Sequence, residues 1–233
     1  LGRIEPLDGT RVLAGPSGFS AAGAVISELR VKEGDWVEPG QILAVLDGFN
    51  LYQAEVSRQQ ELLEEAQVAL KRLQGLSTSQ SISVSSLDEA RYRASTLQAE
   101  LGVAEARVEM TLLRAPQRGQ VLKIYTFPGE KVGIEGVLEL GETDKMTVVA
   151  EVYETDVQRV APGQIATISS PALEQAATGK VIKVGYRVGK MDVLSSDPVA
   201  DTDARVVETT ILMDNPAPMQ RLTNLQVDVE IQP

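Results

Sequence analysis

The spacing of apolar residues divides the chain into three kinds of segment. Residues 11–47 and 114–138 hold short alternating apolar runs between Gly and Pro residues, which is typical of small strands joined by tight turns. Residues 48–113 contain no Pro and are dense in Glu, Gln, Arg, Leu and Ala, which predicts helix. Strand patterns return after residue 139, at 146–152, 164–168, 180–184, 206–213 and 225–231. The predicted order is therefore β, then α, then β.

The helical region carries two apolar seams of heptad spacing. The first seam consists of Leu62, Ala66, Ala69, Leu73 and Leu76, and the second of Leu87, Ala90, Ala94, Leu97, Leu101, Ala104 and Val108. Narrow seams of this period bury against another helix, and the nearest partners are each other. The Ser-rich segment 75–86 separates them, and Ser86 with Glu89 is expected to cap the second helix. We predict an antiparallel coiled-coil hairpin; two helices lying flat on a sheet are the alternative, which would need wider apolar faces.

An internal repeat with an offset of 95 residues flanks the helices. Gly34-Asp35 corresponds to Gly129-Glu130, and both copies are expected to form a strand, a Gly-acidic turn and a second strand. The matching apolar pairs are Ile26 with Val121, Leu29 with Ile124, Val37 with Val132, Ile42 with Val137, and Leu43 with Leu138. Two such halves form one sandwich only if the helices leave and return at neighbouring points, so Asp47 and Arg114 are expected to lie close together. Chance similarity of two Gly-rich turns is the alternative explanation.

Composition narrows the functional classes. The 233 residues include 22 Lys and Arg against 33 Asp and Glu, for a formal net charge of -11, and no basic cluster is longer than Lys71-Arg72. This balance argues against nucleic acid as a partner. The chain has no His and no Cys, so the usual neutral-pH acid/base, a thiol nucleophile and a common zinc ligand set are all missing. We therefore expect neither an enzyme nor a bound cofactor.

Three rival chemistries can be drawn from the residues: a metal site, glycoside hydrolysis and a lysine-linked carrier. Asp197, Asp201 and Asp203 could hold a metal ion, but they lack the Gly and distal Glu of a Ca2+ loop, so a solvated loop is favoured. Paired carboxylates for glycoside hydrolysis could come from Glu151, Glu154 and Asp156, but strand alternation and a turn explain these residues. No Gly-rich phosphate loop is present.

The third rival is a lysine-linked swinging-arm carrier, and its only candidate is Lys145. This residue follows both repeat halves instead of lying between them, so the carrier hypothesis is rejected. The single tryptophan, Trp36, follows the first Gly-acidic turn and is expected to pack in the core.

The residues resemble a known family. Residues 31–43 (VKEGDWVEPGQIL) are similar to the first half of a biotinyl/lipoyl-type domain, and 114–119 with 128–132 to the second half. A lipoyl-like domain split by a coiled-coil hairpin and followed by a β-barrel is the layout of the periplasmic adaptor, or membrane fusion, proteins of the HlyD family. Three short strings most resemble the DevB-like subgroup, the cyanobacterial adaptors of heterocyst-glycolipid-type ABC exporters, at 140–144, 151–154 and 222–227.

Pattern and resemblance together predict a mostly β protein with a long α-helical hairpin. We expect a β-barrel-like domain from residues 1–11 and 134–233, a split lipoyl-like domain from 12–47 and 114–133, and an antiparallel coiled-coil hairpin from 48–113.

The resemblance implies a function that the residues alone do not give. It implies a periplasmic adaptor that links an inner-membrane ABC transporter, permease plus ATPase, to a TolC-like outer-membrane channel. Several copies would form a ring, expected to be a hexamer in the assembled pump, and the subgroup strings suggest glycolipid as cargo. Because the chain begins with Leu1 and not Met, we expect an N-terminal segment that anchors it to the inner membrane to be missing. The alternative function is a periplasmic scaffold without a transport role, whose hairpin binds another coiled coil.

The resemblance also implies a binding site. The family's channel-docking motif is an Arg, a Leu four residues later and a Ser seven residues after that, at the hairpin tip. Arg72, Leu76 and Ser83 have this spacing and lie where the heptad count places the tip. An ordinary solvated helix end is the alternative explanation, since the tip contains six serines between residues 77 and 86.

Overall fold

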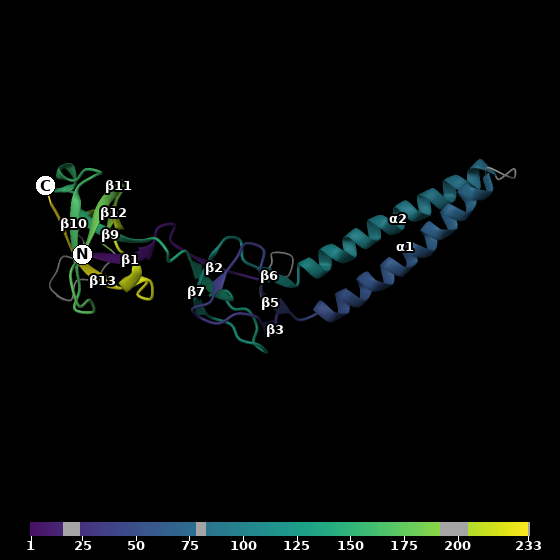
Figure 1. The fold of residues 1–233 in the computed structure, drawn as a ribbon, viewed down its shortest axis with the longest axis horizontal. Helices are drawn as coiled ribbons and strands as arrows, with labels where there is room; N and C mark the ends of the chain where they lie inside the picture. The colour runs from purple at the N-terminus through teal and green to yellow at the C-terminus, as the bar shows by residue number, and fades with distance from the viewer. Residues whose placement is uncertain (16–23, 78–82, 192–204, 233) are drawn as a thin grey trace. The chain divides into compact units, whose positions relative to one another are not determined.

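The computed structural model describes residues 1–15, 24–77, 83–191 and 205–232, and the chain forms two compact units (Figure 1). The first unit combines Leu1–Arg11 with Glu139–Pro233, and the second is Val12–Leu138. The elements in chain order are β1 (Gly2–Pro6), β2 (Thr10–Leu13), β3 (Ile26–Leu29), β4 (Trp36–Val37), β5 (Ile42–Leu46), α1 (Phe49–Ser77), α2 (Val84–Glu109), β6 (Leu112–Arg114), β7 (Gly119–Ile124), β8 (Leu138–Gly141), β9 (Met146–Tyr153), η1 (Val157–Arg159), β10 (Ile165–Ser169), β11 (Ala177–Lys190), β12 (Arg205–Met213), η2 (Ala217–Met219) and β13 (Gln226–Ile231). In the described ranges, neither helix combines the length and the apolar character that crossing a bilayer requires.

The first unit is a closed antiparallel barrel with the strand order β1-β13-β10-β11-β12-β9. All five strands that the sequence pattern predicted after residue 139 are confirmed, although β11 is much longer than expected, with 14 residues. The N-terminal strand β1 closes the barrel, since it pairs with β9 along one edge and with β13 along the other. Its residues alternate between buried and half-buried, as a barrel wall requires. The buried core consists of Ile4, Met146, Val148, Ala150, Ala166, Ile168, Val181, Ile211, Met213, Met219 and Val227.

The strands outside the barrel form two sheets with the orders β2-β8-β7-β4 and β3-β5-β6, which together are called the sandwich below. Equivalent residues of the two repeat copies make equivalent hydrogen bonds. Gly34 N–H donates to the carbonyl of Val121 at 2.7 Å, and its counterpart Gly129 N–H donates to the carbonyl of Ile26 at 2.8 Å. Both glycines adopt positive φ, 92° and 89°. The repeat inferred from the sequence is therefore confirmed as a pseudo-twofold pair.

The acidic residue after each glycine has a local structural role. The carboxylate of Asp35 accepts a hydrogen bond from Lys32 N–H at 2.8 Å, and that of Glu130 accepts one from Phe127 N–H at 2.8 Å. Each carboxylate thereby closes its own turn by bonding the backbone three residues earlier. This hydrogen bond explains why both copies carry an acidic residue directly after the glycine.

The chain leaves and re-enters the sandwich at neighbouring points, but not at the residues that the sequence analysis named. Leu46 N–H donates to the carbonyl of Thr111 at 2.8 Å, which closes the base of the hairpin. Arg114 instead lies opposite Ile42 in the β5–β6 ladder, so the expected proximity of Asp47 and Arg114 was wrong. The reason is that α2 ends at Glu109 and strand pairing begins at Leu112, before the residue taken as the re-entry point.

Trp36 is not a core residue, contrary to the prediction. Its side chain is 39% exposed, and the guanidinium of Arg118 lies 4.4 Å from the centre of its ring. The neighbouring Val37 points into the sandwich instead and is buried. Because side chains alternate along a strand, Val37 occupies the core position and Trp36 points outward, where a cation–π contact covers its indole.

Helices α1 and α2 lie side by side as an antiparallel hairpin (Figure 1). The α2 seam is confirmed, because all seven of its predicted residues are buried or half-buried. The α1 seam was wrong in part: Leu62, Ala66 and Leu73 are buried or half-buried as predicted, but Ala69 and Leu76 are exposed. The inward positions of α1 are Val56, Gln59, Leu63, Ala66, Leu70 and Leu73. The predicted and the observed heptad registers share Ala66 and Leu73. The observed register was missed because it contains the polar Gln59, which a count of apolar residues does not include.

The helix ends also differ from the prediction. Helix α2 begins at Val84 with Ser83 at its N-cap position, so Ser86 already lies inside the helix and does not cap it. Its last helical residue is Glu109, and Thr111 closes the C-terminus by donating its side-chain hydroxyl to the carbonyl of Val108 at 2.6 Å. The run of serines gives no sequence signal for which of them is the cap, because each has the same capping chemistry.

Candidate functional site

The end of the hairpin carries the three residues that the sequence analysis singled out. Arg72 and Leu76 lie one helical turn apart near the end of α1, so they project from the same side of that helix. Both side chains are exposed, and Leu76 retains 41% of its surface. An exposed leucine beside an exposed guanidinium provides an apolar contact and a fork of hydrogen-bond donors on one face.

Ser83 lies on the other side of the connecting segment, at the N-cap of α2. Its backbone is extended, with φ −62° and ψ 129°, and its carbonyl accepts hydrogen bonds from Ser86 N–H and Leu87 N–H. Its side chain is exposed and makes no capping hydrogen bond to the helix. The Ser83 hydroxyl therefore does not serve as the cap of the helix end.

Arg72 also borders a groove of about 430 Å3 along the outer side of α1. The other residues of this groove are Glu61, Glu64, Glu65, Val68 and Ala69. In the part of the chain that the structure describes, Arg72 has no ion-pair partner, although it follows three glutamates on the same face. This face could not be recognised from the sequence, because a polar helix surface with one valine carries no periodic signal.

The base of the hairpin is fixed by ion pairs. Arg58 donates two hydrogen bonds to the Glu55 carboxylate and holds its pKa at about 2. At the opposite strand junction, Arg114 donates to Glu109 and lowers the pKa of that carboxyl. Arg114 also donates to the carbonyl of Gly40 at 2.9 Å, so it ties the end of α2 to the sandwich.

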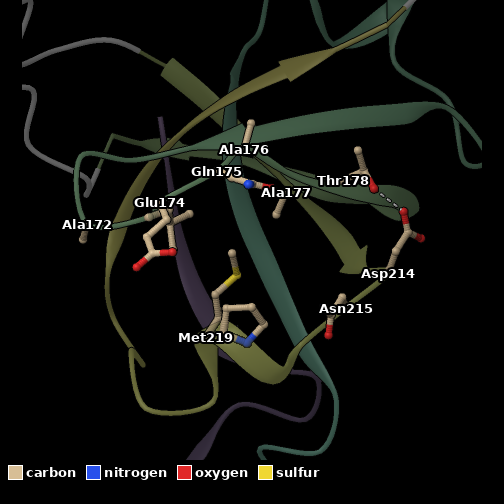
Figure 2. Close-up of a pocket in the computed structure, with 11 residues that line it drawn as sticks. Ala172, Glu174, Gln175, Ala176, Ala177, Thr178, Asp214, Asn215 and Met219 are labelled. Atoms are coloured by element: carbon tan, nitrogen blue, oxygen red, sulfur yellow. Dashed lines mark hydrogen bonds between the residues drawn. The ribbon is translucent and has the colours of Figure 1, made fainter.

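A cavity of about 660 Å3 opens in the barrel unit (Figure 2). Thr178 donates its hydroxyl to Asp214 at 2.6 Å on one side, and the buried Met219 lies across the opening from it. None of the residues predicted from the sequence lines this cavity, since its walls come from the connections that flank β11 and β12. Its lining residues include no Lys or Arg.

The remaining sequence candidates form no site among the residues that the structure describes. Asp197, Asp201 and Asp203 lie outside the described residues. Within the described ranges, no group of three or more Asp or Glu residues could hold a metal ion. Glu151 is buried in the barrel wall, whereas Glu154 and Asp156 are exposed in the following turn.

Comparisons with known proteins agree with this geometry. Residues 49–113 match the family model described as "RND MFP, alpha-helical hairpin domain". The chain is 29% identical over 170 residues to the macrolide export protein MacA of Escherichia coli O157:H7, an alignment that covers 60% of this chain and 46% of that protein. It is 27% identical over 176 residues to MacA of Yersinia pestis, with coverage of 62% and 47%. The chain therefore spans about half the length of these relatives.

Solved structures share the fold over nearly the whole chain. The membrane fusion protein Spr0693 from Streptococcus pneumoniae R6 gives a TM-score of 0.66 at 16% identity, with 99% of this chain and 98% of that chain covered. A MacA-MexA chimeric protein that contains the Pseudomonas aeruginosa MexA α-hairpin gives 0.64 at 19% identity, with coverage of 98% and 82%. The mostly β fold with an α-hairpin is thus confirmed. The hairpin, residues 49–113, thus matches the hairpin-domain family of membrane fusion proteins, and the chain as a whole shares the fold of membrane fusion proteins.

Proposed function

We propose that this chain is the periplasmic adaptor of a tripartite export system, in which it links an inner-membrane ABC transporter to a TolC-like outer-membrane channel. Several copies form a ring, with a hexamer expected in the assembled pump, and the hairpin tip docks on the channel. The observation that carries the proposal is the exposure of Arg72, Leu76 and Ser83 at the end of a hairpin that matches the membrane fusion family.

The chemistry of the tip supports a protein partner. The chain supplies an apolar knob, a planar donor fork and a small hydroxyl within a short stretch, and interface anchors are typically arranged in this way. The buried cluster of the hairpin consists of Val56, Leu63, Leu101 and Ala104 and does not include the three tip residues. A purely structural explanation therefore leaves the exposed Leu76 without a function.

The cargo and the anchor belong to the same proposal. The MacA relatives are named for macrolide export, which supports an export role for this chain. Glycolipid remains the cargo that the DevB-like strings suggest, and anchoring to the inner membrane on its periplasmic side belongs to the same proposal.

The first test uses the absence of cysteine from the chain. Ser85→Cys places one thiol on an exposed position beside the tip, and Thr96→Cys places a matched thiol on an exposed position of the same helix, about 16 Å further from the tip. In cells, a short thiol-to-amine crosslinker is expected to attach the outer-membrane channel to Ser85→Cys and not to Thr96→Cys. Capture of some other periplasmic protein, with a functional channel present, would favour a scaffold role instead.

The second test concerns the docking residues themselves. Arg72→Asp and Leu76→Ser are expected to abolish export at unchanged protein levels, because they remove a charge-assisted donor and an apolar anchor from the contact. Glu64→Gln, on the same helix but farther from the tip, is the control and should export normally. Normal export from both tip variants would refute the docking assignment.

A further inference from the structure

The cavity of the barrel unit lies between two connections that hydrogen bonds hold in place. In the connection from β10 to β11, Ser170 donates its hydroxyl to the carbonyl of Gln226 at 3.2 Å, and its own carbonyl accepts from Leu173 N–H at 3.0 Å. On the opposite wall, Asp214 N–H donates to the carbonyl of Thr178 at 3.1 Å, and the Thr178 hydroxyl donates back to the Asp214 carboxylate at 2.6 Å. Both walls are thus tied to the barrel strands, and the cavity is formed in the free chain, as small-molecule sites usually are.

The floor of the cavity is apolar and continuous with the barrel core. Met219 is 1% exposed and belongs to the buried core cluster, and Leu173 and Ala177 pack against the same cluster. A methionine side chain is flexible and polarisable, so it adapts to apolar groups of different shape. The volume of about 660 Å3 lies in the range of sites that hold small organic molecules. The cavity therefore has room for a small molecule and a surface that favours its apolar part.

The rim of the cavity is acidic. Figure 2 shows Glu174 on one side of the opening and Asp214 on the other, with Met219 between them in this view. Both carboxylates are exposed, and within the described ranges neither has a Lys or Arg partner. The remaining polar side chains of the lining, Gln175, Thr178 and Asn215, are uncharged. The opening therefore carries two negative charges without a compensating base, which attracts cations and repels anions.

The ligand groups favour an organic cation over a metal ion. Ca2+ takes about six to eight oxygen ligands, and the described residues contain no group of three or more acidic side chains that could hold a metal ion. A protonated amine needs only one or two carboxylates, to which it donates charge-assisted hydrogen bonds. Its carbon chain can at the same time cover the apolar floor, whereas a hydrated metal ion would leave Met219 without a contact.

We propose that this cavity binds a small amphipathic organic cation, an amine whose protonated head lies between Glu174 and Asp214 and whose apolar body rests on Met219. Water screens the exposed carboxylates and the ligand is small, so a six-carbon amine should bind with a dissociation constant on the order of 1 mM. The inference is independent of the docking proposed for the hairpin tip. It gives the barrel unit a binding role of its own.

Titration of the 15N-labelled full chain with matched six-carbon probes tests this site by NMR. Hexylammonium is expected to give saturable shifts of the backbone amides of Thr178, Asp214 and Met219. Hexanoate has the same chain with the opposite charge and hexanol has no charge, so both should bind at least about tenfold more weakly. Methylammonium keeps the charged head without the apolar body, and it should also bind at least about tenfold more weakly.

Charge-neutralising variants add an independent arm. Asp214→Asn keeps an oxygen that can accept from Thr178, and Glu174→Gln keeps the size of the side chain. Each should weaken hexylammonium binding several-fold, and the two together at least about tenfold. Glu154→Gln is the matched control, because it removes one exposed carboxylate that does not line the cavity, and it should bind like the parent chain.

The site is overturned by any of four results in the parent chain or in the variants. These are the absence of saturable shifts, shifts centred away from the cavity, equal binding of hexylammonium and one of the three comparison probes, and unchanged affinity in the Glu174→Gln/Asp214→Asn double variant. Circular dichroism checks that the variants are folded. If a variant does not fold, the comparison of the four probes on the unmodified chain decides.

Discussion

The sharpest prediction concerns Gln59, the one polar residue in the α1 seam. Its side chain is only 7% exposed, and it lies between the buried Val56 and Leu63 along the seam. The amide nitrogen donates to Glu55 at 3.0 Å, but the amide oxygen has no hydrogen-bond partner. We expect Gln59→Leu to stabilise the hairpin.

The magnitude follows from three contributions. Removing a buried, unpaired carbonyl relieves a penalty of about 1–3 kcal/mol. A buried leucine adds apolar contact at a position whose neighbours in the seam are already apolar, a further gain of about 1 kcal/mol after the aliphatic part of glutamine is discounted. The lost hydrogen bond to Glu55 costs little, because that carboxylate is solvated and keeps both bonds from Arg58. The two gains sum to about 2–4 kcal/mol, so after the small cost of the lost hydrogen bond the net stabilisation should be at least about 2 kcal/mol.

Urea unfolding followed by the helical circular dichroism signal measures this change. Gln60→Leu is the matched control, since Gln60 is the exposed neighbour on the same helix and should shift stability by no more than about 0.5 kcal/mol. A destabilised Gln59→Leu protein would refute the reasoning, because it would mean that the amide oxygen is satisfied in solution and that the polar seam residue contributes to stability.

Two further predictions address the sandwich and the hairpin base. Gly34→Ala and Gly129→Ala should each destabilise the sandwich by about 1–2 kcal/mol in urea unfolding followed by Trp36 fluorescence. An added Cβ meets no atom at either site, so the cost comes from the positive φ alone. Gly133→Ala, with open space and no positive φ, should change the stability little, and clearly unequal losses at Gly34 and Gly129 would contradict the pseudo-twofold. Because the pKa of Glu55 is lowered from 4.5 to about 2 in the folded chain, its ion pair stabilises the hairpin above pH 4.5, and this stabilisation is lost as the pH falls toward 2. In an acid titration followed by circular dichroism, Glu55→Gln should therefore lose less helical signal than the parent chain. Identical titrations would rule out the Glu55–Arg58 pair as the cause.

Elements with strong local periodicity were predictable from the sequence. The α2 seam has an apolar residue at every inward position, so its register is unambiguous. The barrel strands after residue 139 alternate clearly enough to be found by pattern alone. The repeat was detectable because each copy has a glycine at a positive φ, Gly34 and Gly129, followed by an acidic residue that closes the turn. Both requirements are local, so they leave a pattern in the sequence.

The site was predictable only in part. The positions of Arg72, Leu76 and Ser83 at the hairpin end follow from the helix count, and their assignment as docking residues stays a prediction.

The sequence by itself determined which segments are helical and which are extended, because propensity and periodicity act over a few residues. The tertiary structure decided the choices that are locally degenerate. Two heptad registers fit α1, and packing against α2 selected the one that contains Gln59. Val37 and Trp36 could each have filled the sandwich core, and the pairing of β4 with β7 turned the tryptophan outward against Arg118. Likewise, β1 closes the barrel only because β9 and β13 leave complementary edges far away in the sequence, and no local pattern encodes such long-range pairing.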